Sequence, residues 1–321
     1  MGKYIMGAIA ASLLLFPSCK KDTTSTSTTT CSSVLYGNSA PASLYDSASA
    51  FGVINPASAT LTGTATFMGT NYENQAAFNT SDNCYYVFKT HMGGNTSPGP
   101  LYKISTSGTI TSLTTTGTSQ YSSPVYDRAN NKLYCIKDNQ LAEITIAGST
   151  FSTTGLVTPI HYFSNAGCVT VDNNTGDVYY LTANDTITYY IEKYHPGSSA
   201  SVSVASGSFS AGTTVWGVQG LRFNKNDNML YATRGAYAAP TFDFIKINPA
   251  SGTISTVATI TGCINPEFYS ACIDPCSNRY IISTPRTPAA PTIAVLYQLS
   301  MTGTVIHCDT TASLLQGMDV N

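Results

Sequence analysis

A repeat with a period close to 50 residues is the feature of this sequence that most restricts its fold. Each copy has an apolar strand end, a polar turn and a second strand rich in tyrosine, as in PVYDRANNKLYCI and LRFNKNDNMLYAT. Successive copies are 48, 45, 52, 50 and 47 residues apart. The residues that mark the strand ends are Phe78, Tyr126, Val171, Phe223, Ile273 and Val320.

A second pattern runs in phase with the first and adds another pair of strands to each copy. It consists of a strand, a turn containing Gly or Ser, and a strand rich in Thr and Val, as in FIKINPASGTISTVATI and LYQLSMTGTVIHCD. Each unit therefore holds two hairpins, and no stretch shows helical periodicity. Four-stranded antiparallel units of this length predict an all-β fold, the β-propeller.

The count of units predicts six blades, one of them split between the chain ends. Five complete units begin near Asn74, Ser122, Gly167, Gln219 and Tyr269. The C-terminal GMDVN supplies a first strand only, and residues 32–67 supply the other three. Joining them would close the ring and leave no open sheet edge. A seven-bladed ring with one degenerate blade and a pair of β-sandwiches are the alternatives.

The turns carry a resemblance to known propellers. DNNTGDVYY, from Asp172 to Tyr180, fits the D/N-x-x-[ST]-G-x-[LV]-Y pattern found in NHL-like, YncE-like and SMP-30-like proteins. The likeness spans nearly all of residues 32–321, which we expect to form the propeller domain. Its motifs are structural, so the resemblance implies a fold and leaves the function open.

The first 31 residues resemble the export signal and tether of a bacterial lipoprotein. An apolar run of twelve, from Ile5 to Phe16, is too short to span a bilayer, which needs about 20 residues. LLLFPSC resembles a lipobox, and the SCKKD ending is similar to lipoproteins of Bacteroidetes-type bacteria. The resemblance implies a signal peptide at 1–18 and lipidation of Cys19. The polar composition of residues 20–30 cannot form a core and predicts a flexible Thr/Ser stalk, so that 19–31 hold the lipidated cysteine and the stalk. The expected location is the cell envelope, at the outer membrane, either periplasmic or surface-exposed.

Charge and cysteine content fit an exported protein. Only 10% of residues are charged, against about 25% in typical soluble domains, and the net charge of −2 argues against nucleic-acid binding. Eight cysteines besides Cys19 permit disulfides in an oxidising compartment. Their pairing cannot be deduced, but the four in the last sixty residues are the best candidates to include a bridge. They are Cys263, Cys272, Cys276 and Cys308.

The candidate site residues lie in loops that a propeller gathers on one face, around the mouth of the central channel. Aromatic rings beside Gln and Asn suit a glycan or peptide, and two arginines from adjacent blades suit an anion. The rival role for such residues is packing between blades. The candidates are Tyr72, Glu73, Gln75, Tyr121, His161, Trp216, Gln219, Arg234, Tyr237, Glu267, Tyr269, Arg286 and Gln316.

No motif points to catalysis, a cofactor or a metal. The four histidines have no metal-binding spacing, and GxSxG, GxGxxG and Walker motifs are absent from the sequence. The stretch 172–177 lacks the glutamate that completes a calcium loop. The sequence therefore favours a binding module for a glycan, peptide or envelope protein. The alternative is a metal-dependent hydrolase or lactonase at the channel mouth, with Glu73, Asn74 and Glu267 as candidates.

Overall fold

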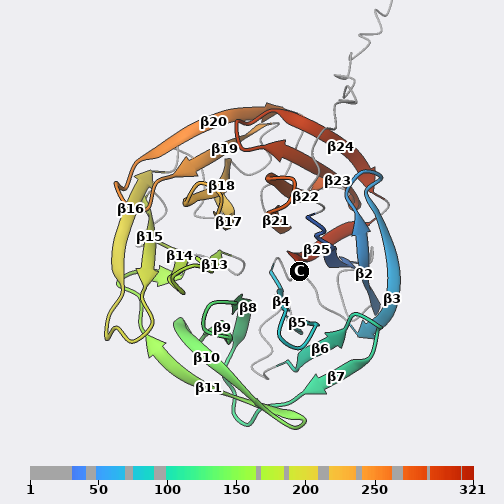
Figure 1. Cartoon of the computed structure of the whole chain (residues 1–321), viewed down its shortest axis with the longest axis vertical. Coiled ribbons are helices and arrows are strands. Elements are labelled where there is room, and N and C mark those ends of the chain that lie inside the picture. Colours follow the sequence, from blue (N-terminus) through green and yellow to red (C-terminus); the bar gives the residue numbers. More distant parts are fainter. Residues whose placement is uncertain are drawn as a thin grey trace, which may run out of the picture.

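The protein is a ring of six antiparallel sheets around a central axis, five with four strands and one, in which the inner strand is divided in two, with five (Figure 1). This computed structural model describes residues 31–40, 48–68, 75–89, 99–163, 168–183, 188–208, 217–235, 241–261, 270–287, 290–311 and 313–321. Six blades confirm the predicted propeller, and the seven-bladed and sandwich alternatives are wrong. In the described part of the chain, no helix is long and apolar enough to cross a membrane.

The blades are numbered from 1 to 6 around the ring. For each blade the strands are given in order from the central channel to the outer edge. Blade 1 holds β25 (Leu314–Val320), β1 (Leu35–Ala40), β2 (Ala48–Asn55) and β3 (Thr60–Met68). Blade 2 holds β4 (Ala77–Asn79), β5 (Cys84–Phe88), β6 (Leu101–Ser105) and β7 (Ile110–Leu113). Blade 3 holds β8 (Tyr121–Asp127), β9 (Lys132–Lys137), β10 (Gln140–Ala147) and β11 (Thr150–Val157).

The other three blades follow the same order. Blade 4 begins with β12 (Tyr162–Phe163) and β13 (Val169–Val171), which both pair with β14 (Val178–Ala183), and continues with β15 (Thr188–Tyr194) and β16 (Val202–Ser208). Blade 5 holds β17 (Val218–Asn224), β18 (Met229–Gly235), β19 (Thr241–Ile247) and β20 (Ile254–Thr261). Blade 6 holds β21 (Ser270–Asp274), β22 (Arg279–Thr287), β23 (Ala290–Ser300) and β24 (Val305–Thr311).

The two ends of the described chain close the ring in blade 1, as predicted. β25 pairs antiparallel with β1, with Leu35 opposite Val320 and Ala40 opposite Leu314. Asn321 N donates to Val34 O at 3.2 Å, and Val34 N donates to the side-chain Oδ1 of Asn321 at 2.7 Å, which extends the contact by one residue at that end. The C-terminus consequently lies near the centre of the ring (Figure 1).

A disulfide adds a covalent tie beside this closure. Cys31 is bonded to Cys276, 245 residues away, with 5.3 Å between their Cα atoms. Ser33 Oγ donates to Asp274 Oδ1 at 2.6 Å in the same place. These contacts join the entry of blade 1 to the first turn of blade 6. One of the four cysteines expected to include a bridge thus does so, with a partner outside that group.

The turns between first and second strands have the same hydrogen-bond pattern in five blades. An Asn or Asp begins each turn, and its side chain accepts from the backbone N–H two residues ahead, over 2.8–3.1 Å. Four residues later an Asn or Gly adopts positive φ, which these residue types tolerate. The pairs are Asn79 and Asn83, Asp127 and Asn131, Asp172 and Gly176, Asn224 and Asn228, and Asp274 and Asn278.

These turns lie at one end of the ring, which we call the turn face. It consists of the turns at 80–83, 128–131, 172–177, 225–228 and 275–278 together with the turns between third and fourth strands. The opposite end, the loop face, consists of the connections between blades and between second and third strands. Because every inner strand runs from the loop face to the turn face, a residue's place in its strand gives its depth in the channel.

Apolar and tyrosine side chains fill the space between blades. Tyr85 and Tyr280 are fully buried, and each donates its hydroxyl to a glycine carbonyl in the preceding blade's inner strand over 2.7 Å. The acceptors are Gly317 and Gly220. The Tyr-rich second strands of the repeat therefore connect blade to blade.

Replacing Cys31 and Cys276 by Ser is expected to destabilise the protein by about 2–4 kcal/mol, because the crosslink restricts the unfolded chain. Thermal unfolding with and without reductant measures this. Reductant should lower the Tm of the wild type to that of the double variant and leave the variant unchanged. An equal Tm for both proteins under oxidising conditions would contradict the prediction.

Candidate functional site

A cavity of about 100 Å³ occupies the central channel and draws on the inner strands of all six blades. It exceeds the ~10–15 Å³ that one water needs. Its wall mixes apolar side chains with a few charged and amide groups. The lining residues are Gln75, Ala76, Phe78, Val125, Tyr126, Arg128, Val169, Thr170, Val171, Asn173, Arg222, Phe223, Ile273 and Asp319.

Bulges in the inner strands aim two opposite charges into this cavity. In β17 the pairing register shifts between Gln219 and Arg222, and in β25 it shifts between Gln316 and Asp319. The glycine after each Gln has positive φ, +64° at Gly220 and +54° at Gly317. A bulge turns the following side chains to the other face of a strand. Arg222 and Asp319 thereby occupy equivalent places in blades 5 and 1.

Arg222 is fixed by backbone acceptors and keeps donors for the cavity. The residue is buried, with a relative exposure of 9%. Nε donates to Ala271 O and Nη1 to Leu221 O, both at 2.8 Å. Within the described residues, Nη2 has no hydrogen-bond partner. The guanidinium group is therefore held by one edge, and its other nitrogen remains available at the cavity wall.

Asp319 is the carboxylate of the cavity. Its Oδ2 accepts from Phe78 N at 2.6 Å, and its Oδ1 accepts from Val320 N at 2.9 Å. Burial raises the pKa of this carboxyl above its ordinary value, although Arg128, the two backbone donors and Arg222 act in the opposite direction. The net effect favours the neutral acid more than in water.

Arg128 stands at the opening of the cavity on the turn face. It follows β8 and is exposed, and its backbone N–H donates to Asn173 Oδ1 at 2.7 Å. Its Nη2 donates to Val320 O in β25 of blade 1. Arg128 and Asn173 thus form a rim that joins blades 3, 4 and 1.

Gln75 bridges the channel toward the loop face. Its Nε2 donates to Val169 O at 2.6 Å, and Val169 N donates to its Oε1 at 3.2 Å. The side-chain amide of Gln75 therefore connects blade 2 to blade 4. Gln75 is buried, with a relative exposure of 2%. Since Gln75 and Val169 also line the cavity, they form its inner end, and the opening lies at the turn face.

Two predicted site residues serve packing or support. Tyr121 stacks on Phe88 and meets Phe151 edge-on, with ring centroids 5.6 and 5.2 Å apart. His161 stacks on Tyr190 with centroids 3.7 Å apart, and its Nδ1 lies 2.9 Å from Glu192 Oε1. These contacts fit the alternative role for such residues, which is packing between blades.

Glu192 is a fully buried carboxylate that anchors the connection from blade 3 to blade 4. Its two oxygens accept from Ile160 N, His161 N, Thr182 Oγ1 and Ser201 Oγ over 2.8–3.0 Å. Burial by itself would raise the pKa of Glu192. The hydrogen bonds outweigh burial and hold that pKa below its ordinary value.

The remaining described candidates do not form one cluster. Arg234 donates to Asp243 Oδ2 at 2.9 Å and to Thr256 Oγ1 at 3.2 Å, within its own blade. Gln219 and Gln316 are buried at the bulges of β17 and β25, and the amide of Gln316 has no hydrogen-bond partner among the residues that the structure describes. Among the predicted residues that the structure describes, Gln75 lines the cavity.

Several predictions concern residues that the structure does not describe. The side chain of Arg286 is among them, so the binding of an anion by Arg234 and Arg286 together remains a prediction, as does lipidation of Cys19. The other candidates outside the described residues are Tyr72, Glu73, Asn74, Trp216, Tyr237, Glu267 and Tyr269.

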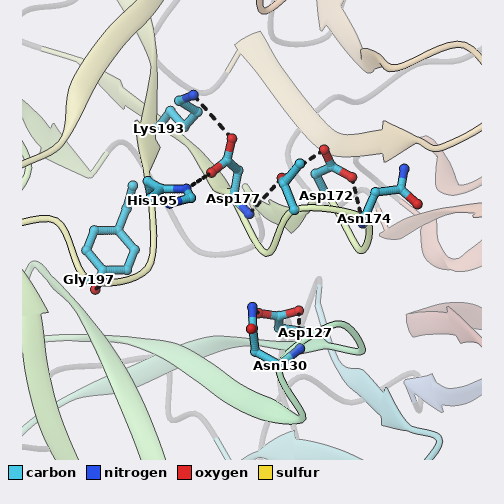
Figure 2. A network of polar contacts seen from close by, with 10 residues as sticks. Asp127, Asn130, Asp172, Asn174, Asp177, Lys193, His195 and Gly197 are labelled. Atoms are coloured by element: carbon cyan, nitrogen blue, oxygen red, sulfur yellow. Dashed lines mark hydrogen bonds and ion pairs between the residues drawn. The ribbon is translucent and has the colours of Figure 1, made fainter.

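The stretch from Asp172 to Asp177 forms the turn that the sequence predicts. Asp172 accepts from Asn174 N and Thr175 Oγ1, while Asp177 contacts Lys193 at 3.2 Å and His195 at 2.6 Å (Figure 2). Both carboxylates thus face donors of the protein. In the described ranges, no three His, Cys, Asp or Glu side chains are placed to hold a metal ion.

Sequence reasoning missed Arg128, Arg222, Asp319 and Asn173 as site residues. Arg222 and Asp319 are the second residues of LRFN and MDVN. Each follows a Gln-Gly dipeptide and lies three residues after its glutamine. That internal correspondence is a signal that could have identified them. In the other four blades the equivalent inner-strand position holds Ala, Val, Thr or Cys. A charged residue at this position therefore departs from the repeat.

Solved structures share this fold at low sequence identity. The chain resembles a structure from a nidogen/laminin complex (12% identity, 90% of this chain and 98% of that chain, TM-score 0.57). It also resembles the periplasmic gluconolactonase PpgL of Pseudomonas aeruginosa (9%, 90% and 98%, TM-score 0.55) and a protein from Lactobacillus plantarum (14%, 90% and 99%, TM-score 0.53). Comparison with known families and with curated proteins gives no match. The chain is thus similar to these proteins in its β-propeller fold.

Replacing Glu192 by Gln is expected to cost about 2–3 kcal/mol at neutral pH, because charge-assisted hydrogen bonds are lost in a buried site. The lowered pKa means that Glu192 stabilises the fold above the unfolded carboxyl pKa and that this contribution is lost as pH falls through the folded pKa. Urea unfolding at several pH values measures the difference between the proteins, which should shrink in acid. Glu143→Gln, which breaks a partly exposed pair with Lys132, is the control and should cost under about 1 kcal/mol. A pH-independent cost at Glu192 would contradict the prediction.

Proposed function

We propose that this protein is a lipid-anchored binding module of the cell envelope. It captures a glycan, a peptide or a segment of an envelope protein at the turn-face mouth of its channel. The observation that carries the proposal is the polar cavity in an otherwise apolar ring, with Arg222 and Asp319 placed there by matching bulges. Concave sites with a few fixed polar groups are typical of ligand binding.

The rigidity of the cavity supports binding. Arg222, Asp319 and Gln75 are each held by backbone groups of another blade. A ligand entering this site would find its partners already oriented, which lowers the entropic cost of binding. A spacer protein would gain nothing from charged side chains in its channel, because burying them costs free energy.

The expected tether fits the same face. Cys31 is bonded to Cys276 in a turn of the turn face, so the chain enters the domain beside the cavity mouth. Eleven residues lie between Cys19 and Cys31, and the segment can reach roughly 40 Å when fully extended. With Cys19 lipidated, the binding mouth would lie toward the membrane, where envelope glycans and proteins are close by.

Binding of glycan and peptide arrays by the purified wild type, Arg128→Gln and Arg234→Gln tests the proposal. Arg128 lies at the rim, so its replacement should weaken binding by about tenfold or more, as expected for a lost charged hydrogen bond. Arg234 is paired with Asp243 outside the cavity, and its replacement should leave affinity unchanged. Absence of binding by the wild type, or equal binding by both variants, would contradict the proposed site.

A second candidate function is hydrolysis of a lactone or related ester, and Asp319 is the observation that favours it. A cavity carboxyl with a raised pKa suits a general acid. The metal-dependent form of this function would use Glu73, Asn74 and Glu267, which lie outside the described residues. The periplasmic gluconolactonase that shares this fold makes lactones the natural first probe.

Hydrolysis of a panel of sugar lactones, with metal analysis of the purified protein, tests this second function. Asp319→Asn should abolish turnover if Asp319 is the acid, whereas Glu73→Gln or Glu267→Gln should abolish it if a metal acts at the loop face. Wild-type turnover no faster than the reaction without protein would eliminate the hydrolase.

A further inference from the structure

We propose that the channel cavity is a site for a singly charged carboxylate group, such as that of a sugar acid or a peptide C-terminus. The inference deepens the proposed binding function and rests on it. It names the chemistry that the mouth recognises, and it separates that chemistry from neutral sugars and from multiply charged phosphates.

The charges of the cavity set the charge of the ligand. Arg128 and Arg222 contribute two positive charges, and Asp319 offsets one of them when ionised. One positive charge is then left without a partner at the wall of the cavity. A monoanion would neutralise it, whereas a dianion would leave one negative charge in excess. Charge complementarity in a partly enclosed site therefore favours a carboxylate.

The free donors of the cavity set the kind of atom it accepts. Arg222 uses Nε and Nη1 on backbone oxygens, which leaves Nη2 for a ligand. Asn173 uses its Oδ1 on Arg128 N, which leaves its amide N–H groups at the rim. By contrast, both Asp319 oxygens already accept backbone N–H groups. Donors therefore outnumber acceptors, and oxygen atoms with lone pairs are the complement.

The shape of the cavity limits how much of the ligand enters. Gln75 spans from blade 2 to Val169 of blade 4 and forms the inner end, so a ligand can enter from the turn face but cannot pass through. About 100 Å³ accommodates a carboxylate and its adjoining carbon atoms. The rest of a glycan or peptide would remain outside the rim that Arg128 and Asn173 form.

Calorimetric titration of the full mature protein with sodium acetate, sodium glucuronate, glucose and inorganic phosphate tests the assignment. Acetate and glucuronate should bind, glucuronate more tightly, while glucose and phosphate should bind at least about tenfold more weakly than glucuronate. Arg128→Gln and Arg222→Lys should each weaken glucuronate binding by about tenfold or more. Arg234→Gln is the matched arginine control and should bind as the wild type does.

The outcomes separate this inference from the proposed function. Tighter binding of phosphate or glucose than of glucuronate would overturn the carboxylate assignment. If array ligands bind at the turn face but no carboxylate does, the binding module stands and its assigned chemistry is wrong. If neither binds, both proposals fail. Because Arg222 is buried, unfolding curves must show that Arg222→Lys is folded, and exposed Arg128 gives the same test independently.

Discussion

The pairing of β25 with β1 is the interaction on which the whole structure depends. Each blade alone is a four-stranded sheet with two apolar faces, and it is stable only between two neighbours. A ring meets that need only when its last blade contacts its first. Here the closing contact is a strand ladder inside one sheet, reinforced by the bond between Cys31 and Cys276. Closure of the ring and the packing of blade 1 against its neighbours therefore depend on the same strand pairing.

The repeat builds its blades with a small set of devices used more than once. In blades 2 and 5 a turn aspartate accepts from a tyrosine of the second strand and contacts a lysine of the third, whose Nζ lies over the same tyrosine ring. The two sets are Asp82, Tyr86 and Lys103, and Asp227, Tyr231 and Lys246. These groups neutralise one another near the turn face. The arginines of the cavity differ because their side chains donate to backbone oxygens, that of Arg222 to Ala271 O and Leu221 O and that of Arg128 to Val320 O.

The sequence predicts the architecture well because the relevant information is local. Asn and Gly at fixed offsets specify the turns, and alternation specifies which strand faces are buried, so the blade count and the split blade follow from the repeat. The candidate site could not be found in this way. Arg222 reaches the cavity only because a bulge changes the register after Gln219, and a bulge is visible only once its partner strand is known.

His161 illustrates the same limit from the opposite side. Its place in an inter-blade connection is correctly predicted, yet its role is decided by Glu192, which lies 31 residues later and on another strand. A carboxylate that receives several backbone and hydroxyl donors is a structural anchor, and nothing in the residues adjacent to His161 indicates it. Tyr121 is similar, since Phe88 and Phe151 reach it from two blades.

The position of a propeller's variable residues explains why a site can arise in its channel without disturbing the ring. The inner-strand position that holds Arg222 in blade 5 and Asp319 in blade 1 holds Val125 in blade 3 and Thr170 in blade 4, and all four residues line the channel cavity. Charged residues there are tolerated when a neighbouring blade's backbone satisfies them, as Ala271 O does for Arg222 and Phe78 N does for Asp319. The same bonds that make the charges tolerable also fix their orientation, and a fixed orientation is what selective binding requires.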